Sequence, residues 1–272
     1  VITNIGTCHL ENLGDRDGVL KAKTEIFQSM KTNGHIVLNG DDDKLITVRE
    51  YNGVKPVFFG LNSERDVYAD QIESKGLKGV ACRIHLGEDA FDVLVPTPGI
   101  HMVYNALAAA AVGRIYGLTI EEIRRGIESL ETIRGRFKMI ETDKFLVVDD
   151  CYNANPMSMK ASLDVLHDGE GRRVAILGDM GELGEDEAAL HEGVGIHAAT
   201  CGIDACVCVG DLAVHIAEAA RKANPDFPVY YEKTRESLLE HLNDYVQKGD
   251  TILVKASHFM KFEEVVKALE EM

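Results

Sequence analysis

The sequence contains no tryptophan and no apolar run that approaches the length needed to cross a membrane. A membrane-spanning helix needs about 20 consecutive apolar residues, so none is expected. Positive charge is also scarce, because 29 lysines and arginines stand against 45 acidic residues and leave a net charge of −16. Nucleic acids and anionic membranes require a basic patch, so neither is expected as a partner. A small anionic substrate held by a few local cations is compatible with this balance.

Two further absences concern metal and phosphate sites. The six cysteines, at positions 8, 82, 151, 201, 206 and 208, lack the spacing of a zinc ribbon. Reduced, structural thiols in a cytoplasmic protein are therefore expected. No Gly-Lys dipeptide occurs, so the sequence has no Walker A loop. Any phosphate chemistry would have to borrow its phosphate cradle from residues outside this sequence.

The most informative stretch runs from Asp149 to Met159. The apolar segment 145–148 before it indicates a buried strand, and a helical pattern follows. We expect Asn155 to cap that helix and Pro156 to occupy its first position. Ligands of open α/β sheets bind at the carboxyl ends of strands, so the acids and amides here favour a ligand site. An ordinary strand-to-helix turn with polar surface residues is the alternative.

A regular alternation of strands and helices begins near residue 145 and predicts a mostly parallel, doubly wound sheet. The expected strands are 145–149, 173–178, 205–210, 228–231 and 251–255. The expected helices are 156–167, 186–200, 212–223, 235–247 and 259–271. We place a domain boundary near residue 141, which divides the chain into residues 1–141 and 142–272.

The first part of the chain is more varied. Strands are expected at 1–5, 35–39 and 57–59, followed by two alternating stretches within 80–95 that predict an antiparallel hairpin at a sheet edge. Helices are expected at 16–30, 41–50 and 106–116, and Thr119 with Glu122 forms a capping-box pattern that begins another.

Lys23 falls in the middle of the apolar stripe that Val19, Ile26 and Met30 form on the predicted helix 16–30. Its stem could simply pack while its amine reaches water. The alternative is functional, because burial lowers a lysine's pKa and a neutral amine can add carbon dioxide. The resulting carbamate is an oxygen donor that suits Mg²⁺. His9, one loop upstream, could supply a nitrogen ligand, although a loop histidine is more often only solvated.

Two glycine-containing loops could contact phosphate. Arg136 follows Gly135 in a predicted loop and is a candidate phosphate clamp, or else an exposed loop arginine. The run Gly178–Gly184 follows a strand and nearly matches the dinucleotide fingerprint G-x-G-x-x-G. Asp179 stands where the middle glycine of that fingerprint would be, and its carboxylate would repel a pyrophosphate. NAD binding at this loop is therefore not favoured.

Several runs together resemble the Mur ligases over essentially the whole chain. They are Asn4–Gly14, Lys21–Phe27, Pro98–Leu107, Gly135-Arg136, Asp150–Met159, Gly178–Gly184 and Val254–Ser257. The runs Asp-x-Tyr-Asn-Ala-Asn and Gly-Asp-Met-x-Glu-Leu-Gly are the most specific of these. The resemblance implies a truncated ATP-binding central domain followed by a Rossmann-like C-terminal domain. The N-terminal domain and the P-loop half of the central domain would then lie outside this sequence.

The resemblance also implies an activity. It is that of a cytoplasmic ATP-dependent amide ligase of peptidoglycan precursor synthesis, which adds D-Ala-D-Ala to UDP-MurNAc-tripeptide through an acyl phosphate. ATP and Mg²⁺ are the implied cofactors, and a monomer is expected.

The residue roles carried over from the family are a metal site at His9 and at a carbamylated Lys23, and nucleotide contacts from several other side chains. The nucleotide-contacting positions are His101, Asn105, Arg136, Asp150, Asn153 and Asn155. Arg136 would also take part in catalysis, together with Lys23 and His9. Three positions depart from the pattern: Met102 stands where asparagine is frequent, Ala256 where glycine is frequent, and His258 where arginine is frequent.

Two other functions remain open at this point. The chain could be a fragment that binds nucleotide or dipeptide without catalysing a reaction, because it lacks a P-loop. An NAD-dependent oxidoreductase is the third reading, and only the Rossmann-like rhythm favours it.

Overall fold

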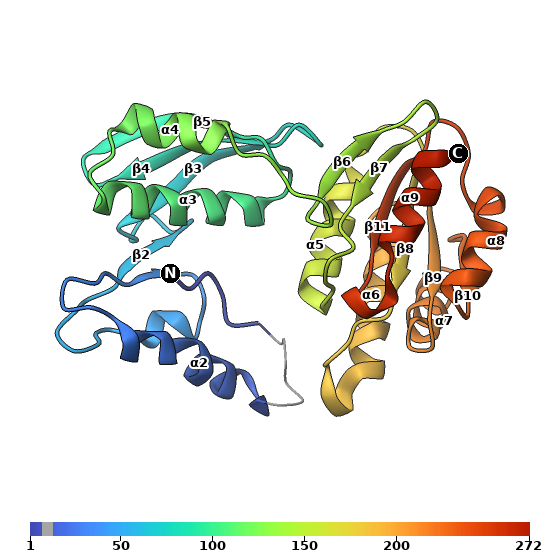
Figure 1. Ribbon diagram of the computed structural model, residues 1–272, viewed down its shortest axis with the longest axis horizontal. Helices are drawn as coiled ribbons and strands as arrows, with labels where there is room; N and C mark the ends of the chain where they lie inside the picture. Colours follow the sequence, from blue (N-terminus) through green and yellow to red (C-terminus); the bar gives the residue numbers. More distant parts are fainter. Residues whose placement is uncertain (7–12) are drawn as a thin grey trace. The chain divides into compact units, whose positions relative to one another are not determined.

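The computed structural model describes residues 1–6 and 13–272. The chain forms two compact units, Val1–Glu131 and Thr132–Met272 (Figure 1). The boundary expected near residue 141 falls inside the second unit. The reason is that β6 (Lys138–Glu141), a strand missed in the sequence, pairs antiparallel with β7 (Leu146–Asp149).

The first unit contains a five-stranded sheet in the order β1-β2-β3-β4-β5. Its strands are Val37–Asn39, Val57–Gly60, Val67–Ser74, Val80–Leu86 and Asp89–Val95. The first three run parallel, whereas β4 and β5 return antiparallel and confirm the predicted edge hairpin. Their side chains alternate between buried and accessible, as expected for a sheet that is covered on one face only.

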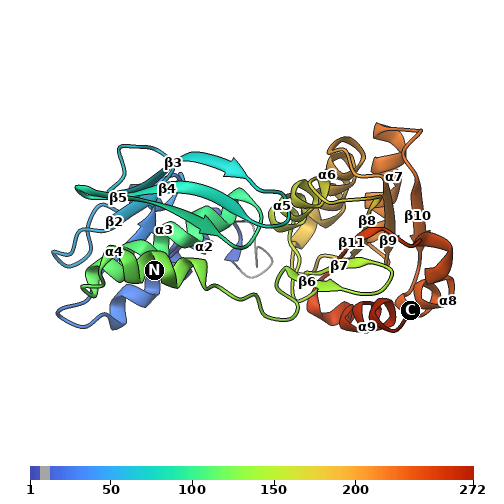
Figure 2. The same ribbon diagram turned by 90° about the horizontal axis from the view of Figure 1, so that it is seen from above.

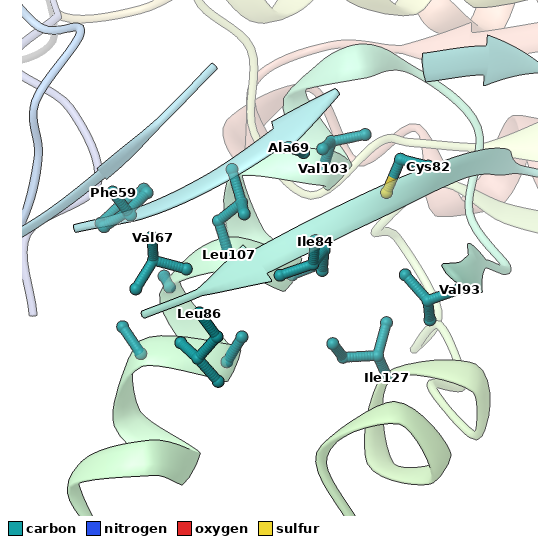
Figure 3. Close-up of a cluster of buried hydrophobic side chains, with 14 of the residues drawn as sticks. Phe59, Val67, Ala69, Cys82, Ile84, Leu86, Val93, Val103, Leu107 and Ile127 are labelled. Atoms are coloured by element: carbon teal, nitrogen blue, oxygen red, sulfur yellow. The ribbon is translucent and has the colours of Figure 1, made fainter. Parts of the chain in front are cut away.

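Two helices cover that face. They are α3 (Ile100–Ile115) and α4 (Ile120–Glu128), and the predicted capping box at Thr119 and Glu122 begins the second. Figure 3 shows Leu107 of α3 and Ile127 of α4 beside Ile84 of the sheet, within the core of this unit. Helix α3 begins at Ile100, earlier than the expected residue 106, so the motif residues before the alanine-rich segment are helical.

A smaller cluster packs around α2 (Arg16–Thr24), where Val19 and Phe27 contact the core. The expectation of one helix over 16–30 is wrong, because α2 ends at Thr24 and a 3₁₀ helix, Glu25–Ser29, follows. A 3₁₀ helix turns about 120° per residue instead of 100°, so the buried stripe changes phase. Phe27 is therefore buried, and Ile26 is 61% exposed.

Two expected elements at the beginning of the chain are shorter than predicted. Within the strand expected at 1–5, only Ile2 forms a bridge, to Leu38. The helix expected at 41–50 is reduced to a 3₁₀ turn, Leu45–Thr47. Asp42 explains the second difference, because its carboxylate accepts backbone N–H groups of Ile5 and Leu45 and so competes with helical hydrogen bonds.

The second unit contains a six-stranded sheet in the order β10-β9-β8-β11-β7-β6. The strands not yet given are β8 (Arg173–Gly178), β9 (Ala205–Val209), β10 (Val229–Glu232) and β11 (Thr251–Lys255). All pairs are parallel except the edge pair of β6 and β7. This arrangement confirms the predicted mostly parallel sheet.

Helices lie on both faces of this sheet, as Figure 2 shows. One face carries α5 (Pro156–His167), α6 (Glu187–Thr200) and α7 (Ala213–Ala223). The other carries α8 (Arg235–Tyr245) and α9 (Glu263–Glu271), so the sheet is doubly wound as expected. Short 3₁₀ turns, Gly184–Asp186 and His258–Met260, lie ahead of α6 and α9. Within the described residues, no helix combines the length and apolar character that crossing a membrane requires.

The position of β11 decides which loops meet. It lies between β7 and β8, so the carboxyl ends of these three strands are neighbours. The loops that follow them begin at residues 150, 179 and 256, and together they carry most of the motif residues of this unit.

Candidate functional site

Lys23 lies in the last turn of α2, where it is exposed. Its Nζ donates a hydrogen bond to the carbonyl of Asn4 at 2.8 Å. The prediction that Lys23 belongs to a buried stripe is therefore wrong. The physical reason is that the α-helix ends at Thr24 and a 3₁₀ helix follows. Ile26 is then exposed, so the apolar stripe expected on both sides of Lys23 does not form.

The predicted metal site is incomplete in the part of the chain that the structure describes. His9 lies outside these residues. Among the residues that are described, no group of three or more histidine, cysteine, aspartate or glutamate side chains could hold a metal ion. Mg²⁺ requires oxygen ligands in near-octahedral geometry, whereas the Lys23 amine is a hydrogen-bond donor. The magnesium site expected at His9 and a carbamylated Lys23 therefore stays a prediction.

His101 and Asn105 lie one turn apart on α3, and both are exposed. The Asn105 amide donates to the Met102 sulfur at 3.3 Å. Met102, which departs from the family pattern, therefore contacts Asn105, the residue that is expected to bind the nucleotide. Asn105 and Met102 also line a pocket of about 470 Å³ between α3 and α4. Its lining is mostly apolar and includes Ile123, so it suits a flat, apolar group with a polar edge.

In the second unit, Asp150 and Lys255 form a nearly buried ion pair. The Lys255 Nζ lies 2.6 Å from Asp150 Oδ2, with side-chain exposures of 3% and 14%. Ser162 of α5 donates to the same oxygen at 2.7 Å, and the backbone N–H of Phe137 donates to the other oxygen at 3.2 Å. Lys255 also donates to the carbonyl of Asn153 at 3.2 Å. The pair thus joins the ends of β7 and β11 to the loop that carries Arg136.

Arg136 is exposed, and its guanidinium lies over the ring of Tyr152 at 4.1 Å from the ring centroid. Tyr152 is half exposed, and its ring lies 5.5 Å from that of His258. The structure therefore brings Arg136 together with the Asp150 loop, whereas the nucleotide contacts expected of both residues stay a prediction. It also places His258, at the position that departs from the pattern, beside the same tyrosine.

The two predicted asparagines have mainly local partners. Asn155 caps α5 by accepting the Ser158 N–H at 2.9 Å, and Ser158 Oγ accepts the Asn155 N–H at 3.1 Å. The two bonds form a capping box, with Pro156 at the first helical position. The predicted cap is confirmed. The exposed Asn153 accepts the N–H of Ala154 at 2.9 Å. Their contact with a nucleotide stays a prediction.

The loop Gly178–Gly184 is held by hydrogen bonds to two side chains outside it, His191 and Ser257. The N–H of Met180 donates to His191 Nε2 at 3.0 Å, and the N–H of Gly181 donates to Ser257 Oγ at 2.9 Å. His191 Nδ1 lies 2.7 Å from the carbonyl of Glu187, so this buried ring must be neutral and protonated at Nδ1. Burial also lowers the pKa of His191. Two loop N–H groups are consumed in this way, which leaves a poor cradle for a pyrophosphate.

Asp179 of the same loop points toward the next β-α connection. Its Oδ1 accepts the N–H groups of Leu212 and Ala213 at 3.1 and 2.7 Å, at the beginning of α7. Burial raises the pKa of this carboxyl. Gly210 has a φ of +124°, and a Cβ at this position would lie 2.3 Å from Asp179 Oδ1. The carboxylate therefore fills the place where a larger residue 210 or a phosphate would lie.

Two domain families match this chain. The Mur ligase middle domain matches residues 1–113, and the Mur ligase, glutamate ligase domain, matches residues 135–258. The chain belongs to the Mur ligase family. Both units of this Mur ligase chain are thus accounted for, in the order that the sequence motifs indicated.

The Mur ligase relatives are longer than this chain. Over its full length the chain is 35% identical to the UDP-N-acetylmuramoyl-tripeptide–D-alanyl-D-alanine ligase of Bacillus subtilis and spans 59% of that protein. It matches the crystal structure of MurF from Acinetobacter baumannii with a TM-score of 0.89 and 32% identity, over 99% of this chain and 59% of the other. It also matches the crystal structure of MurF from Thermotoga maritima in complex with ADP. The TM-score is 0.82 and the identity 26%, over 99% of this chain and 61% of the other.

Sequence reasoning missed three residues that hold the site of the second unit together. Lys255 was noticed only as part of a motif, Tyr152 only as a letter of the Asp-x-Tyr-Asn-Ala-Asn run, and Ser162 not at all. The end of a buried strand is a signal for Lys255, because a cation there needs a buried partner. The signal for Ser162 would have been its position on the inner face of α5, one helical turn after Ser158.

Proposed function

We propose that this chain is the middle and C-terminal part of an ATP-dependent ligase that joins D-Ala-D-Ala to UDP-MurNAc-tripeptide. The observation that carries the proposal is the 35% identity over the whole chain to the Bacillus subtilis ligase of that name. The chain spans 59% of that relative, so the sugar-binding and P-loop functions would belong to segments outside this sequence.

Each unit by itself carries side chains that can contact a nucleotide. The Thermotoga maritima relative was solved with ADP, which supports a nucleotide ligand for this fold. In the first unit, Asn105 at the rim of the apolar pocket can offer amide donor and acceptor groups to a purine edge. In the second unit, Arg136 can offer planar N–H donors to phosphate oxygens. His101, Asn153 and Asn155 are proposed as further contacts of the nucleotide or its surroundings.

The proposed reaction is acyl activation. A carboxylate oxygen of the tripeptide attacks the γ-phosphorus of ATP, and the bond to ADP breaks to leave an acyl phosphate. The amine of D-Ala-D-Ala then attacks the acyl carbon, loses a proton, and phosphate departs as the amide forms. Negative charge collects on phosphate oxygens in both steps, so a fixed cation such as Arg136 lowers the barrier. Asp150 and Lys255 hold the loop of Arg136 in place.

The remaining expectations accompany this proposal. Mg²⁺ would bind where His9 and a carbamylated Lys23 contribute ligands, and it would offset phosphate charge. The protein would act in the cytoplasm as a monomer, in the synthesis of peptidoglycan precursors.

A hybrid protein tests the function directly. This chain would replace the matching 59% of the Bacillus subtilis ligase. We expect phosphate release that depends on ATP, UDP-MurNAc-tripeptide and D-Ala-D-Ala together, and a loss of at least about 100-fold in kcat/KM for Arg136→Met. Arg221→Met is the matched control, since the exposed Arg221 donates to the carbonyl of Val229, away from the loop of Arg136. A folded hybrid with no activity would contradict the proposal.

The same samples separate the alternatives. A non-catalytic binding module would bind ADP in the hybrid without releasing phosphate from ATP. An NAD-dependent oxidoreductase would bind NADH tightly, which the consumed N–H groups of Met180 and Gly181 disfavour.

A further inference from the structure

The backbone around Arg136 is fixed on both sides of the arginine. The N–H of Gly135 donates to Asp149 Oδ2 at 2.9 Å, and the N–H of Tyr152 donates to the carbonyl of Gly135 at 3.0 Å. The N–H of Phe137 donates to Asp150 Oδ1. Asp149 is 1% exposed, so at least one of these anchors is protected from water. Three backbone N–H donors thereby hold this short loop to the end of β7.

Two residues of this loop have positive φ angles, and they flank Arg136. Gly135 has a φ of +77° and Phe137 a φ of +53°, and both residues are buried. A non-glycine residue with positive φ persists only where the surroundings hold it, and the buried Phe137 ring together with the Asp150 hydrogen bond does so. Arg136, between these two residues, is the exposed member of the loop.

The contact between Arg136 and Tyr152 is a cation–π contact. The central carbon of the guanidinium lies over the ring, 4.1 Å from the ring centroid. An aromatic ring accepts no conventional hydrogen bond from all five guanidinium N–H donors at once, so donors are left for another acceptor. Among the ion pairs of the described residues none involves Arg136, whereas Arg134 pairs with both Glu270 and Asp149.

We propose that Tyr152 is a positioning residue for Arg136: it holds the guanidinium over its ring so that the remaining donors meet an oxyanion of the bound nucleotide. This inference rests on the proposed function for the identity of the anion. A long arginine side chain loses conformational freedom when it binds, and a tyrosine that already restricts it reduces that loss. The role requires the aromatic ring and not the phenol hydroxyl.

Side-chain NMR of this chain tests the positioning without any ligand. The Arg136 Nε–H signal should show an ordered side chain and a ring-current shift in the unmodified protein and in Tyr152→Phe. Both should be lost in Tyr152→Leu. Arg134 is the internal control, because its pairing with Glu270 does not involve the ring. An Arg136 signal that is equally ordered in Tyr152→Leu overturns the inference.

Binding of ADP by calorimetry then connects positioning with function. We expect Tyr152→Leu to weaken binding about three- to tenfold, Tyr152→Phe to leave it nearly unchanged, and Arg136→Met to weaken it more. The double variant should bind like Arg136→Met alone, since Tyr152 acts through Arg136. Fully additive losses contradict the positioning role. These titrations use the hybrid protein, because it supplies the P-loop. If the unmodified hybrid binds no ADP, the proposed nucleotide role of this chain fails, and the NMR result still decides the role of Tyr152.

Discussion

Two lysines in motif segments of this chain have opposite surroundings. Lys255, at the end of β11, is 3% exposed and has an aspartate and a backbone carbonyl within 3.2 Å. Lys23, at the end of α2, is exposed and donates to one backbone carbonyl. A cation at the end of a central parallel strand must have a fixed partner, whereas one at a helix end retains its freedom. Lys255 is therefore suited to holding loops. The exposed Lys23 lacks the burial on which its expected carbamylation depended, and that role stays a prediction.

The largest expected effect is on stability and comes from Lys255→Met. The substitution leaves Asp150 nearly buried without its cation, so we expect the second unit to lose about 3–5 kcal/mol. Because the chain forms two compact units and a single unfolding midpoint would average over both, hydrogen exchange of β8 and β11 amides is the measurement.

The double variant Lys255→Met/Asp150→Asn is the control, since it removes both charges, and it should recover part of the loss. A Lys255→Met protein as stable as the parent would remove the contrast between the two lysines.

The second effect concerns the pH dependence of the loop beside Lys255. Burial holds the pKa of His191 below that of an unfolded histidine, so the unfolded chain binds more protons in acid. Stability should therefore fall as pH drops from about 7 through about 6.5 and below, by at most about 1.4 kcal/mol per pH unit. His191→Gln should flatten this slope in urea unfolding.

His241 provides a comparison of opposite sign. Its hydrogen bond to Glu232 raises the pKa of His241, so its contribution is present in acid and is lost as pH rises through the raised value. If His241→Gln flattens the acid slope and His191→Gln does not, the assignment of that slope is wrong.

The third effect separates structure from binding at the end of β7. Asn155→Ala removes the α5 cap and should cost about 1 kcal/mol, whereas Asn153→Ala should cost less than about 0.5 kcal/mol. Thermal unfolding measures both. A larger cost at Asn153 would mean that the loops around Lys255 are held differently from the arrangement described.

The smallest stability effect is expected at Lys23. Replacement by methionine removes one exposed hydrogen bond and should change unfolding by less than about 0.5 kcal/mol. Carbon-13 NMR with labelled bicarbonate tests the chemistry separately: a carbamate signal should appear in the parent and vanish in Lys23→Arg, but persist in Lys21→Arg. If the signal is lost in Lys21→Arg and persists in Lys23→Arg, the reactive amine is that of Lys21 and the assignment to Lys23 is wrong.

The sequence was most informative where one local pattern decides the structure. The strand-to-helix turn at Asn155-Pro156, the capping box at Thr119 and the β-α alternation after residue 145 are confirmed because side-chain periodicity and caps determine them. The helix at 16–30 failed because periodicity cannot reveal where an α-helix tightens into a 3₁₀ helix. That single error placed Lys23 in a buried stripe.

The candidate site was predicted less completely, for a related reason. Arg136 and Asp150 were found through a resemblance, and the structure does bring their loops together. The contacts that hold them come from Ser162, which is 12 residues from Asp150, and from Lys255, which is 105 residues from it. No local pattern encodes a partner about 100 residues away, so only the order of the strands in the sheet could supply it.

The contact between Asp179 and Gly210 has a consequence for how this family can vary. Any side chain at position 210 would collide with the carboxylate of Asp179, which accepts the N–H of Ala213 at the beginning of α7. A larger residue at 210 is therefore tolerated only if residue 179 shrinks in the same lineage and another group satisfies the N–H of Ala213. These two positions should change as a pair across homologues, and a lone substitution at either should be rare.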